Sequence, residues 1–567
     1  MGRSPPDLVP MPSAVRFASA VGLLLACAGS PTAQVDLQNR YLADPDAAVG
    51  LADTVATLWL GAVDDATGAF VTDVSREGVP TGSDRFMLTQ SQNAYGMVRA
   101  FQLTGDTTYL GAARRALDYM TETHWDAGAG GWLDRGAGKA AFTHHFALIG
   151  LSSMVEATHD AYAWEWLLRA YAVNDANLWD DREAYLGYFE SANDDWSNAR
   201  GKAFSSTIDA ITSHALALDL LSEDPAYRQR LLHLADNAVD HFVGSMDARS
   251  FGITESFSSE WVAPSRDTFA FTGHFLKVAW CLARIYQREP DPRYLAAVER
   301  VMDDVLAQRP AYDAMMGQWW EYEDAFSAGV TAYHLTGDEA YLRYADERIE
   351  TLFDDFWDPV YGGFYHTVGD RRKGSYYKTS YHPMEMAYSL YLYGNLFLHD
   401  RPVRLYYQIE PSDAARQIAL TPLAVPDDAL RIAAVTLDGA PFSAFDPDSR
   451  TLTLAAGEGG LFRVTFEGVG GDVAGEATPA PAFVLAQNRP NPTAMSTTVS
   501  YVLDRPGHVL VEVLNTLGER VAVLVDERQS AGEHRVAVAT DGLAAGVYVY
   551  RLSVDGASAS RRMVVAR

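Results

Sequence analysis

Apolar residues recur at helical spacing between residues 47 and 397 of this chain. Apolar positions three and four residues apart predict helices with a buried face. About twelve such stretches can be placed, and short turns join them in pairs. The predicted helices are 47–62, 87–103, 107–123, 143–158, 160–175, 206–222, 226–243, 268–287, 292–308, 318–335, 339–356 and 382–397.

Two long segments of the chain resemble each other. LTGDTTYLGAARRALDYMTETHWDAGAGGWLDRG begins at Leu103, and LTGDEAYLRYADERIETLFDDFWDPVYGGFYHTVG begins at Leu335. In each segment a helix ends at a Trp-Asp pair and a Gly-Gly loop follows. Repeated helix pairs stack side by side, so six pairs predict a closed, all-α (α/α)6 toroid, with an open solenoid as the alternative. The long loops would gather at one end, where function usually resides.

The periodicity changes after Phe397. VRLYYQIEP, RIAAVTLDG, RTLTLAAG and LFRVTFEG alternate apolar and polar residues between turns, which predicts short strands. The sequence therefore predicts a multidomain chain with a barrel over residues 34–402 and a small β-sandwich over 403–468. A linker over 469–482 and a second β-rich domain over 483–567 follow.

The N-terminus has the features of an export signal. Arg16 precedes the apolar run FASAVGLLLACAGS, which is too short for a permanent membrane helix. Residues 1–33 are therefore predicted to be a signal peptide. Cleavage before Cys27, as in a lipoprotein, and ordinary cleavage within ACAGSPTAQ both remain open. No later run reaches 18 consecutive apolar residues, so an integral membrane protein is not expected.

Composition narrows the range of partners. The net charge of −29 and the pI near 4.8 argue against nucleic acid and anionic membranes. Two cysteines cannot form a disulfide framework. The sequence contains no cluster with metal-ligand spacing, no phosphate-binding loop and no Ser-His-Asp signature, so neither a metal nor a cofactor is predicted.

The C-terminal segment carries a specific resemblance. FVLAQNRPNPTAMSTTVSYVL, VEVLNTLGERVAVLV and LAAGVYVYRLSV resemble the type A C-terminal sorting domain of the type IX secretion system. The resemblance implies a Gram-negative bacterium of the Bacteroidetes and related groups. It also implies passage through the periplasm, the type IX secretion machinery as a partner, and a secreted or cell-surface location.

Four stretches of the helical region carry a second resemblance. They are TQSQNAYGMVRAF, TGHFLKVAW, QWWEYEDAFSAGVTAYHLTGDEAYL and KTSYHPMEMAYSL. In order and spacing they resemble the N-acylglucosamine 2-epimerase superfamily, which includes cellobiose 2-epimerases and mannose isomerases. The resemblance implies an (α/α)6 barrel, a sugar or oligosaccharide substrate, and two bases acting on opposite faces of an opened sugar.

The resemblance assigns the candidate residues. His274 and His382 match the two catalytic histidines, and histidine suits both roles because its pKa lies near neutral pH. Asp324 matches a catalytic glutamate of the family. The expected substrate-binding residues are Lys277, Gln92, Trp319, Trp320, Lys378 and Tyr381.

The chain departs from the family pattern at several of these positions. Lys277 stands where the family has a glutamate, and Gln92 stands where it has an arginine. TIDAITSHALAL supplies no histidine in register with the family's His-x-His helix, because His214 is displaced. We expect Lys277 to supply the positive charge that Gln92 lacks, with Asp324 as its anionic neighbour. In the alternative, Lys277 forms a structural ion pair with Asp324 or Glu323 in a site that no longer epimerises.

Three functions remain open from the sequence. The first is a secreted epimerase or isomerase acting on an aldose or on the reducing end of an oligosaccharide. The second is a glycoside hydrolase or polysaccharide lyase on the same barrel, with Asp324 or Glu323 as the acid. The third is a non-catalytic glycan-binding surface protein.

Overall fold

The computed structural model describes residues 36–136, 138–249, 251–264, 271–426, 429–469, 483–485, 488, 493, 495–503, 505–514, 520–540, 542–544, 546–554 and 557–565. The predicted signal peptide lies outside the described residues, as does all of the predicted linker except Val469.

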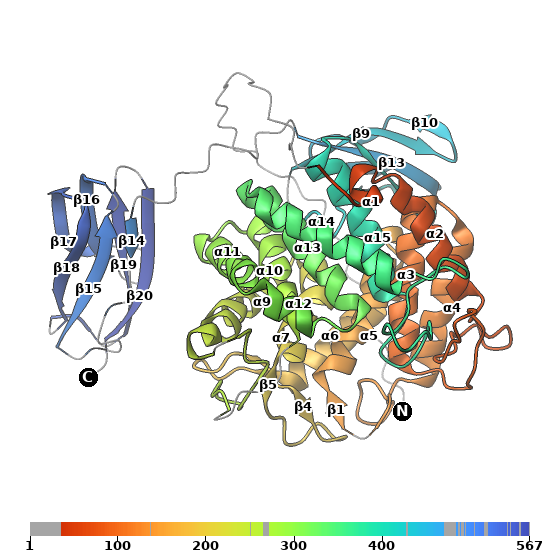
Figure 1. The fold of residues 1–567 in the computed structure, drawn as a ribbon, viewed down its shortest axis with the longest axis horizontal. Helices are drawn as coiled ribbons and strands as arrows, with labels where there is room; N and C mark the ends of the chain where they lie inside the picture. The colour runs from red at the N-terminus through yellow and green to blue at the C-terminus, as the bar shows by residue number, and fades with distance from the viewer. Residues whose placement is uncertain are drawn as a thin grey trace.

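The helices form an inner and an outer ring (Figure 1). The inner ring consists of α3 (Met87–Thr104), α5 (Ala141–Thr158), α7 (Phe204–Ala210) with α8 (Leu216–Leu221), α10 (Thr272–Arg288), α13 (Trp319–Thr336) and α15 (Tyr381–Tyr393). The outer ring consists of α2 (Ala47–Leu60), α4 (Thr107–Thr123), α6 (Ala161–Leu178), α9 (Pro225–Asn237), α11 (Pro292–Ala307) and α14 (Glu339–Phe356).

The inner ring is closed. Its helices contact one another in the order α3, α5, α7, α10, α13 and α15, and α15 returns to contact α3. Nearly every residue of α3 and α5 is buried, whereas α4 and α11 bury one face only. A helix that is buried all round belongs inside, and an amphipathic helix belongs outside. The predicted toroid is therefore confirmed, and the open solenoid is excluded.

The repeated Leu-Thr-Gly-Asp sequence makes the turn between an inner and an outer helix. Gly105 and Gly337 end α3 and α13 in the left-handed region, with φ of 77° and 74°. Asp106 and Asp338 then begin α4 and α14, and each side chain accepts a hydrogen bond from a backbone N–H two residues later. Glycine tolerates the left-handed conformation and aspartate satisfies free amides at a helix start, so the motif specifies the turn.

Shorter elements complete the barrel. They are α1 (Arg40–Ala43), α12 (Arg309–Met315), a 3-10 helix (Val243–Ala248) and the π-helical turns η1 (Ile211–Ala215), η2 (Ala238–Phe242) and η4 (Gly394–Leu398). Short strands pair within the loops: β1 (Lys139–Ala140) with β4 (Ser191–Ala192), β2 (Trp179–Asp180) with β3 (Gly187–Tyr188), and β5 (Lys202–Ala203) with β6 (Ser256–Phe257).

A small β-sandwich follows the barrel. One sheet has the order β10 (Ala440–Phe442), β9 (Leu430–Leu437), β13 (Gly460–Gly468), β7 (Val403–Ile409), and the other has β11 (Phe445–Asp446), β12 (Thr451–Leu454), β8 (Arg416–Ala419). Its core is continuous with that of the barrel. Arg284 of α10 donates to the Leu423 carbonyl at 2.7 Å, and Tyr393 of α15 donates to the Ala424 carbonyl at 3.0 Å. The sandwich therefore packs on the barrel at the C-terminal ends of the inner helices.

The last seven strands form a second sandwich (Figure 1). Its sheets are β14 (Phe483–Leu485), β15 (Ser496–Leu503), β18 (Gly532–Ala539) and β17 (Arg520–Gln529), β16 (Gly507–Leu514), β19 (Gly546–Val554), β20 (Ala557–Val565). The buried residues of this sandwich form a hydrophobic core separate from that of the barrel.

Candidate active site

The two candidate histidines lie near the N-terminal ends of inner helices. His274 is the third residue of α10, and His382 is the second residue of α15. Trp319 and Trp320 open α13, which packs against both of those helices. A Cβ atom on Gly273 would lie 2.4 Å from the Trp320 ring, so the glycine before His274 lets this indole approach α10.

The indole of Trp320 neighbours both imidazoles. Its centroid lies 5.0 Å from that of His274 and 6.0 Å from that of His382. Phe204 of α7 stacks against His274, with centroids 4.0 Å apart. Trp319 lies 6.4 Å from His382. The structure thus brings His274, His382 and the two tryptophans together at one end of the barrel.

A carboxylate holds His274 through Nδ1. The Nδ1 atom lies 3.0 Å from Oε1 of Glu255, a residue of the loop that leads into β6. The same oxygen accepts a hydrogen bond from the backbone N–H of Phe271 at 2.8 Å. The carboxylate of Glu255 thus occupies Nδ1 of His274, and Nε2 is the ring nitrogen that remains for a substrate.

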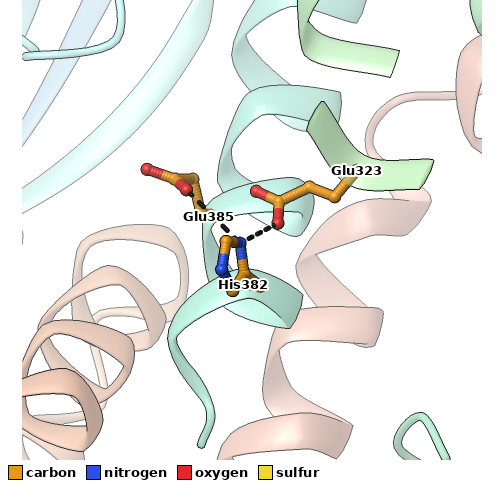
Figure 2. A group of neighbouring side chains, drawn as sticks. All are labelled: Glu323, His382 and Glu385. Atoms are coloured by element: carbon orange, nitrogen blue, oxygen red, sulfur yellow. Dashed lines mark hydrogen bonds and ion pairs between the residues drawn. The ribbon is translucent and has the colours of Figure 1, made fainter. Parts of the chain in front are cut away.

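A second carboxylate holds His382 in the same manner (Figure 2). Its Nδ1 lies 2.6 Å from Oε2 of Glu323 and 4.0 Å from Oε2 of Glu385. Burial, together with the positive charges of Lys277 and Lys378, lowers the pKa of His382 well below its usual range. The ring is therefore neutral at neutral pH, which a general base requires.

Lys277 is buried one helical turn below His274. Its Nζ lies 3.4 Å from Oδ1 of Asp209 on α7, and both side chains are almost fully buried. Burial alone would lower the pKa of Lys277, but the negative charges of Asp209, Asp324 and Glu385 raise it. The expectation that Lys277 pairs with Asp324 or Glu323 is therefore wrong. The ion pair forms instead with Asp209, which α7 supplies.

Asp324 is fully buried next to this pair. Neither carboxylate oxygen has a hydrogen-bond partner among the described residues. Burial raises the pKa of Asp324 well above its usual range, and the negative charge of Glu385 adds to the effect of burial. The carboxylate that contacts His382 is the preceding residue, Glu323. Asp324 therefore lies beside the histidine site without contacting either imidazole.

The remaining candidates surround the site. Gln92 is buried on α3 and accepts a hydrogen bond from Thr379 at 2.9 Å. Tyr381 is fully buried, and its ring lies 5.9 Å from Nζ of Lys277. Nζ of Lys378 lies 3.7 Å from the centroid of Trp319, and burial lowers the pKa of this lysine well below its usual range. These contacts favour a supporting role for Lys378 behind Trp319.

Sequence patterns did not reveal three residues of the site. Glu255 lies in an irregular loop and carries no motif. Asp209 lies in TIDAITSHALAL, a helix that the family pattern marks only by its histidines. Glu385 stands three residues after His382 on α15, a spacing that places both on one helix face, so its position alone could have identified it.

Glu323, His382 and Glu385 could also hold a metal ion. One potential ligand atom from each residue lies within 4.8 Å of the other two. No metal ligands were expected from the sequence, because these residues come from two helices separated by some sixty positions and have no motif spacing.

Comparison with known proteins gives two family matches. The family model described as N-acylglucosamine 2-epimerase (GlcNAc 2-epimerase) matches residues 68–386. The model described as a secretion system C-terminal sorting domain matches residues 489–566. A search of curated proteins found no match. Among the residues that the structure describes, every helix is too short or too polar to span a bilayer.

Solved structures share the fold of the barrel. Cellobiose 2-epimerase from Spirochaeta thermophila DSM 6192 is 19% identical with a TM-score of 0.56, covering 62% of this chain and 97% of that one. A D-mannose isomerase is 18% identical with a TM-score of 0.56, covering 62% and 99%. A sugar epimerase from a ruminal bacterium is 17% identical with a TM-score of 0.54, covering 62% and 98%.

Proposed function

We propose that this chain, which belongs to the N-acylglucosamine 2-epimerase family and ends in a secretion system C-terminal sorting domain, is an exported sugar epimerase or isomerase. It would move a proton at C2 of an aldose or of the reducing end of an oligosaccharide. The sorting domain supports export to the cell surface or beyond, through the type IX machinery of a Gram-negative cell.

One observation carries the proposal. Each histidine is bound at Nδ1 to a buried or half-buried carboxylate, His274 to Glu255 and His382 to Glu323, and both rings neighbour Trp320. The two hydrogen bonds leave both Nε2 atoms available. Two imidazoles that share one aromatic neighbour can act as the proton acceptor and the proton donor that inversion at a carbon atom requires.

The chemistry follows from this pair. The carbonyl at C1 of the opened sugar acidifies the proton on C2, and one imidazole Nε2 removes it to give an enediolate. The other imidazole, which carries a proton of its own, donates that proton to C2 from the opposite face and so inverts the centre, while the first imidazole keeps the proton it removed. Return of the proton to C1 instead would convert the aldose to a ketose.

The enediolate needs positive charge nearby. Lys277 is the cation one turn below His274, and it carries its charge beside Asp209. In this proposal Lys277 stabilises the intermediate electrostatically, in place of the arginine that the family has at the position of Gln92. Trp320 provides an apolar face for the sugar between the two bases.

A hydrolase or lyase on the same barrel would use Glu323 or Asp324 as a buried acid, since burial raises the pKa of both. The hydrogen bond of Glu323 to His382 instead supports a positioning role for this residue. Asp324 remains the acid that the alternative would require. A non-catalytic glycan-binding protein would need neither of the two histidine–carboxylate hydrogen bonds.

Incubation of the purified chain with a reducing disaccharide and, separately, with a polysaccharide distinguishes the three functions. The proposal expects a new C2 epimer or a ketose from the disaccharide, detected by chromatography, and an intact polysaccharide. Shortened chains would favour the hydrolase or lyase. Sugar binding without any product, measured by calorimetry, would favour the glycan-binding protein and contradict the proposal.

A further inference from the structure

The site contains more buried carboxyl groups than the hydrogen bonds and ion pairs among its described residues satisfy. Glu323, Asp324 and Glu385 are each at most 5% exposed, and Asp209 is 4% exposed. The cation paired with this group is Lys277, which contacts Asp209. Buried carboxylates are unfavourable unless they are paired, protonated or bound to a metal, so the interior of the site can accommodate a further positive charge.

Unpaired oxygen atoms show where that charge would bind. Oε1 of Glu323 and Oε2 of Glu385 are buried and have no hydrogen-bond partner among the described residues. Both carboxyl groups face the imidazole of His382 (Figure 2). The ligand atoms of these three residues, hereafter the histidine–carboxylate cluster, lie within 4.8 Å of one another. Ligand atoms at about 2 Å from one ion lie at most about 4 Å apart, so a bound ion would draw the ligands of the histidine–carboxylate cluster slightly closer together.

The ligand types limit the choice of ion. Imidazole nitrogen with two carboxylate oxygens suits Zn²⁺, Mn²⁺, Co²⁺ or Ni²⁺, whereas Mg²⁺ and Ca²⁺ prefer oxygen ligands alone. His382 is 16% exposed at its side chain, so the cluster is open on one side. Three protein ligands with an open fourth position are typical of a zinc site that exchanges its remaining ligand.

We propose that the histidine–carboxylate cluster of Glu323, His382 and Glu385 binds a divalent transition-metal ion, with zinc as the preferred probe. The ion would bind Nδ1 of His382 and one oxygen from each glutamate. It would replace the hydrogen bond between His382 and Glu323.

Metal binding would also block proton transfer at this histidine, a consequence that rests on the proposed function. A neutral imidazole that coordinates a metal through Nδ1 carries its proton on Nε2. The proton moves from Nδ1 to Nε2, and the lone pair that would accept the C2 proton is lost. The metal would therefore act as a reversible inhibitor of the epimerase or isomerase.

The test begins with binding in the absence of sugar. The full-length protein is treated with a chelator, dialysed, and titrated with Zn²⁺ by calorimetry and with Co²⁺ by visible absorption. We expect one saturable site and cobalt d–d bands. Glu385→Gln should weaken binding at least tenfold, and His382→Gln should remove the cobalt bands. Glu299→Gln with Asp303→Asn, on the outer surface at α11, is the matched control and should bind as the wild type does.

Cobalt bands identical in the wild type and in His382→Gln would overturn the site, as would a wild type with no saturable binding. Wild-type protein without saturable binding overturns the site even if a variant fails to fold. In the second arm, saturating Zn²⁺ should slow turnover at least tenfold, and chelator should restore it. Unchanged turnover at saturating Zn²⁺ would overturn the inhibition. A protein that binds metal but turns over no sugar would refute the proposed function and leave the metal site standing.

Discussion

Replacing Lys277 by methionine separates the structural and catalytic roles of this residue. Methionine has a similar length, so the main change is loss of the charge that faces Asp209 at 3.4 Å. Removing one partner of a buried ion pair costs about 3–5 kcal/mol. We expect the lower end, about 3 kcal/mol, because burial already raises the pKa of Asp209 and lets it take up a proton. At roughly 2 °C per kcal/mol for a domain of this size, the melting temperature should fall by roughly 6 °C.

The double variant Lys277→Met with Asp209→Asn is the matched control. It removes both charges, so most of the lost stability should return. Turnover should not return, since the enediolate still lacks its cation. We expect both variants to be slower than the wild type by about 100-fold, or about 2.7 kcal/mol. Calorimetric melting and initial rates on a reducing disaccharide measure the two effects. A double variant that recovers both stability and turnover would show that the lysine is only a structural partner.

Three further predictions concern the rest of the molecule. Glu156→Ala should destabilise the barrel by about 3–5 kcal/mol in urea, because Arg99 would lose a buried ion pair of 2.7 Å; a change below 1 kcal/mol, on the scale of an exposed pair, would contradict this. Burial lowers the pKa of His214 to about 3. Below pH 6.5 the unfolded chain therefore binds more protons than the folded chain, and stability decreases as the pH is lowered. The loss from this residue is about 2 kcal/mol at pH 5. The melting temperature of His214→Gln should consequently fall less between pH 7 and pH 5; equal slopes would refute this. Deleting residues 483–567 should leave turnover and the melting temperature of the barrel unchanged, since the two cores are separate; misfolding would show an integral domain.

The fold was predictable because its signals are local. Leu-Thr-Gly-Asp specifies a C-cap followed by an N-cap, and helix periodicity marks both rings. The rarity of lysine in the sequence also agrees with the structure. All five lysines of the chain are buried, at 3% exposure or less. A buried lysine needs compensating contacts, so each of these positions indicates a specific interaction. The two histidines and the tryptophan pair were found because motifs mark them, and the structure brings them together.

The carboxylates could not be assigned from sequence for two physical reasons. Adjacent helical residues differ by about 100° in direction, so a one-residue ambiguity decides whether Glu323 or Asp324 faces His382. Glu255 reaches His274 from a loop that no periodicity describes. A π-helical turn at Ile211–Ala215 also shifts the register of its helix. His214 consequently stacks on the imidazole of His145, with ring centroids 5.0 Å apart. It does not join His274 and His382.

The proposed epimerase or isomerase depends on His274 and His382 acting as two separate bases on C2. Incorporation of deuterium from the solvent distinguishes two bases from one. In D₂O the wild type should form both C2 epimers, with deuterium at C2 of the product. His274→Asn and His382→Asn should each abolish epimerisation, and each should still exchange the C2 hydrogen of one epimer only, a different epimer for each variant. Retention of the C2 hydrogen in the wild-type product, or the same epimer exchanged by both variants, would contradict the two-base account.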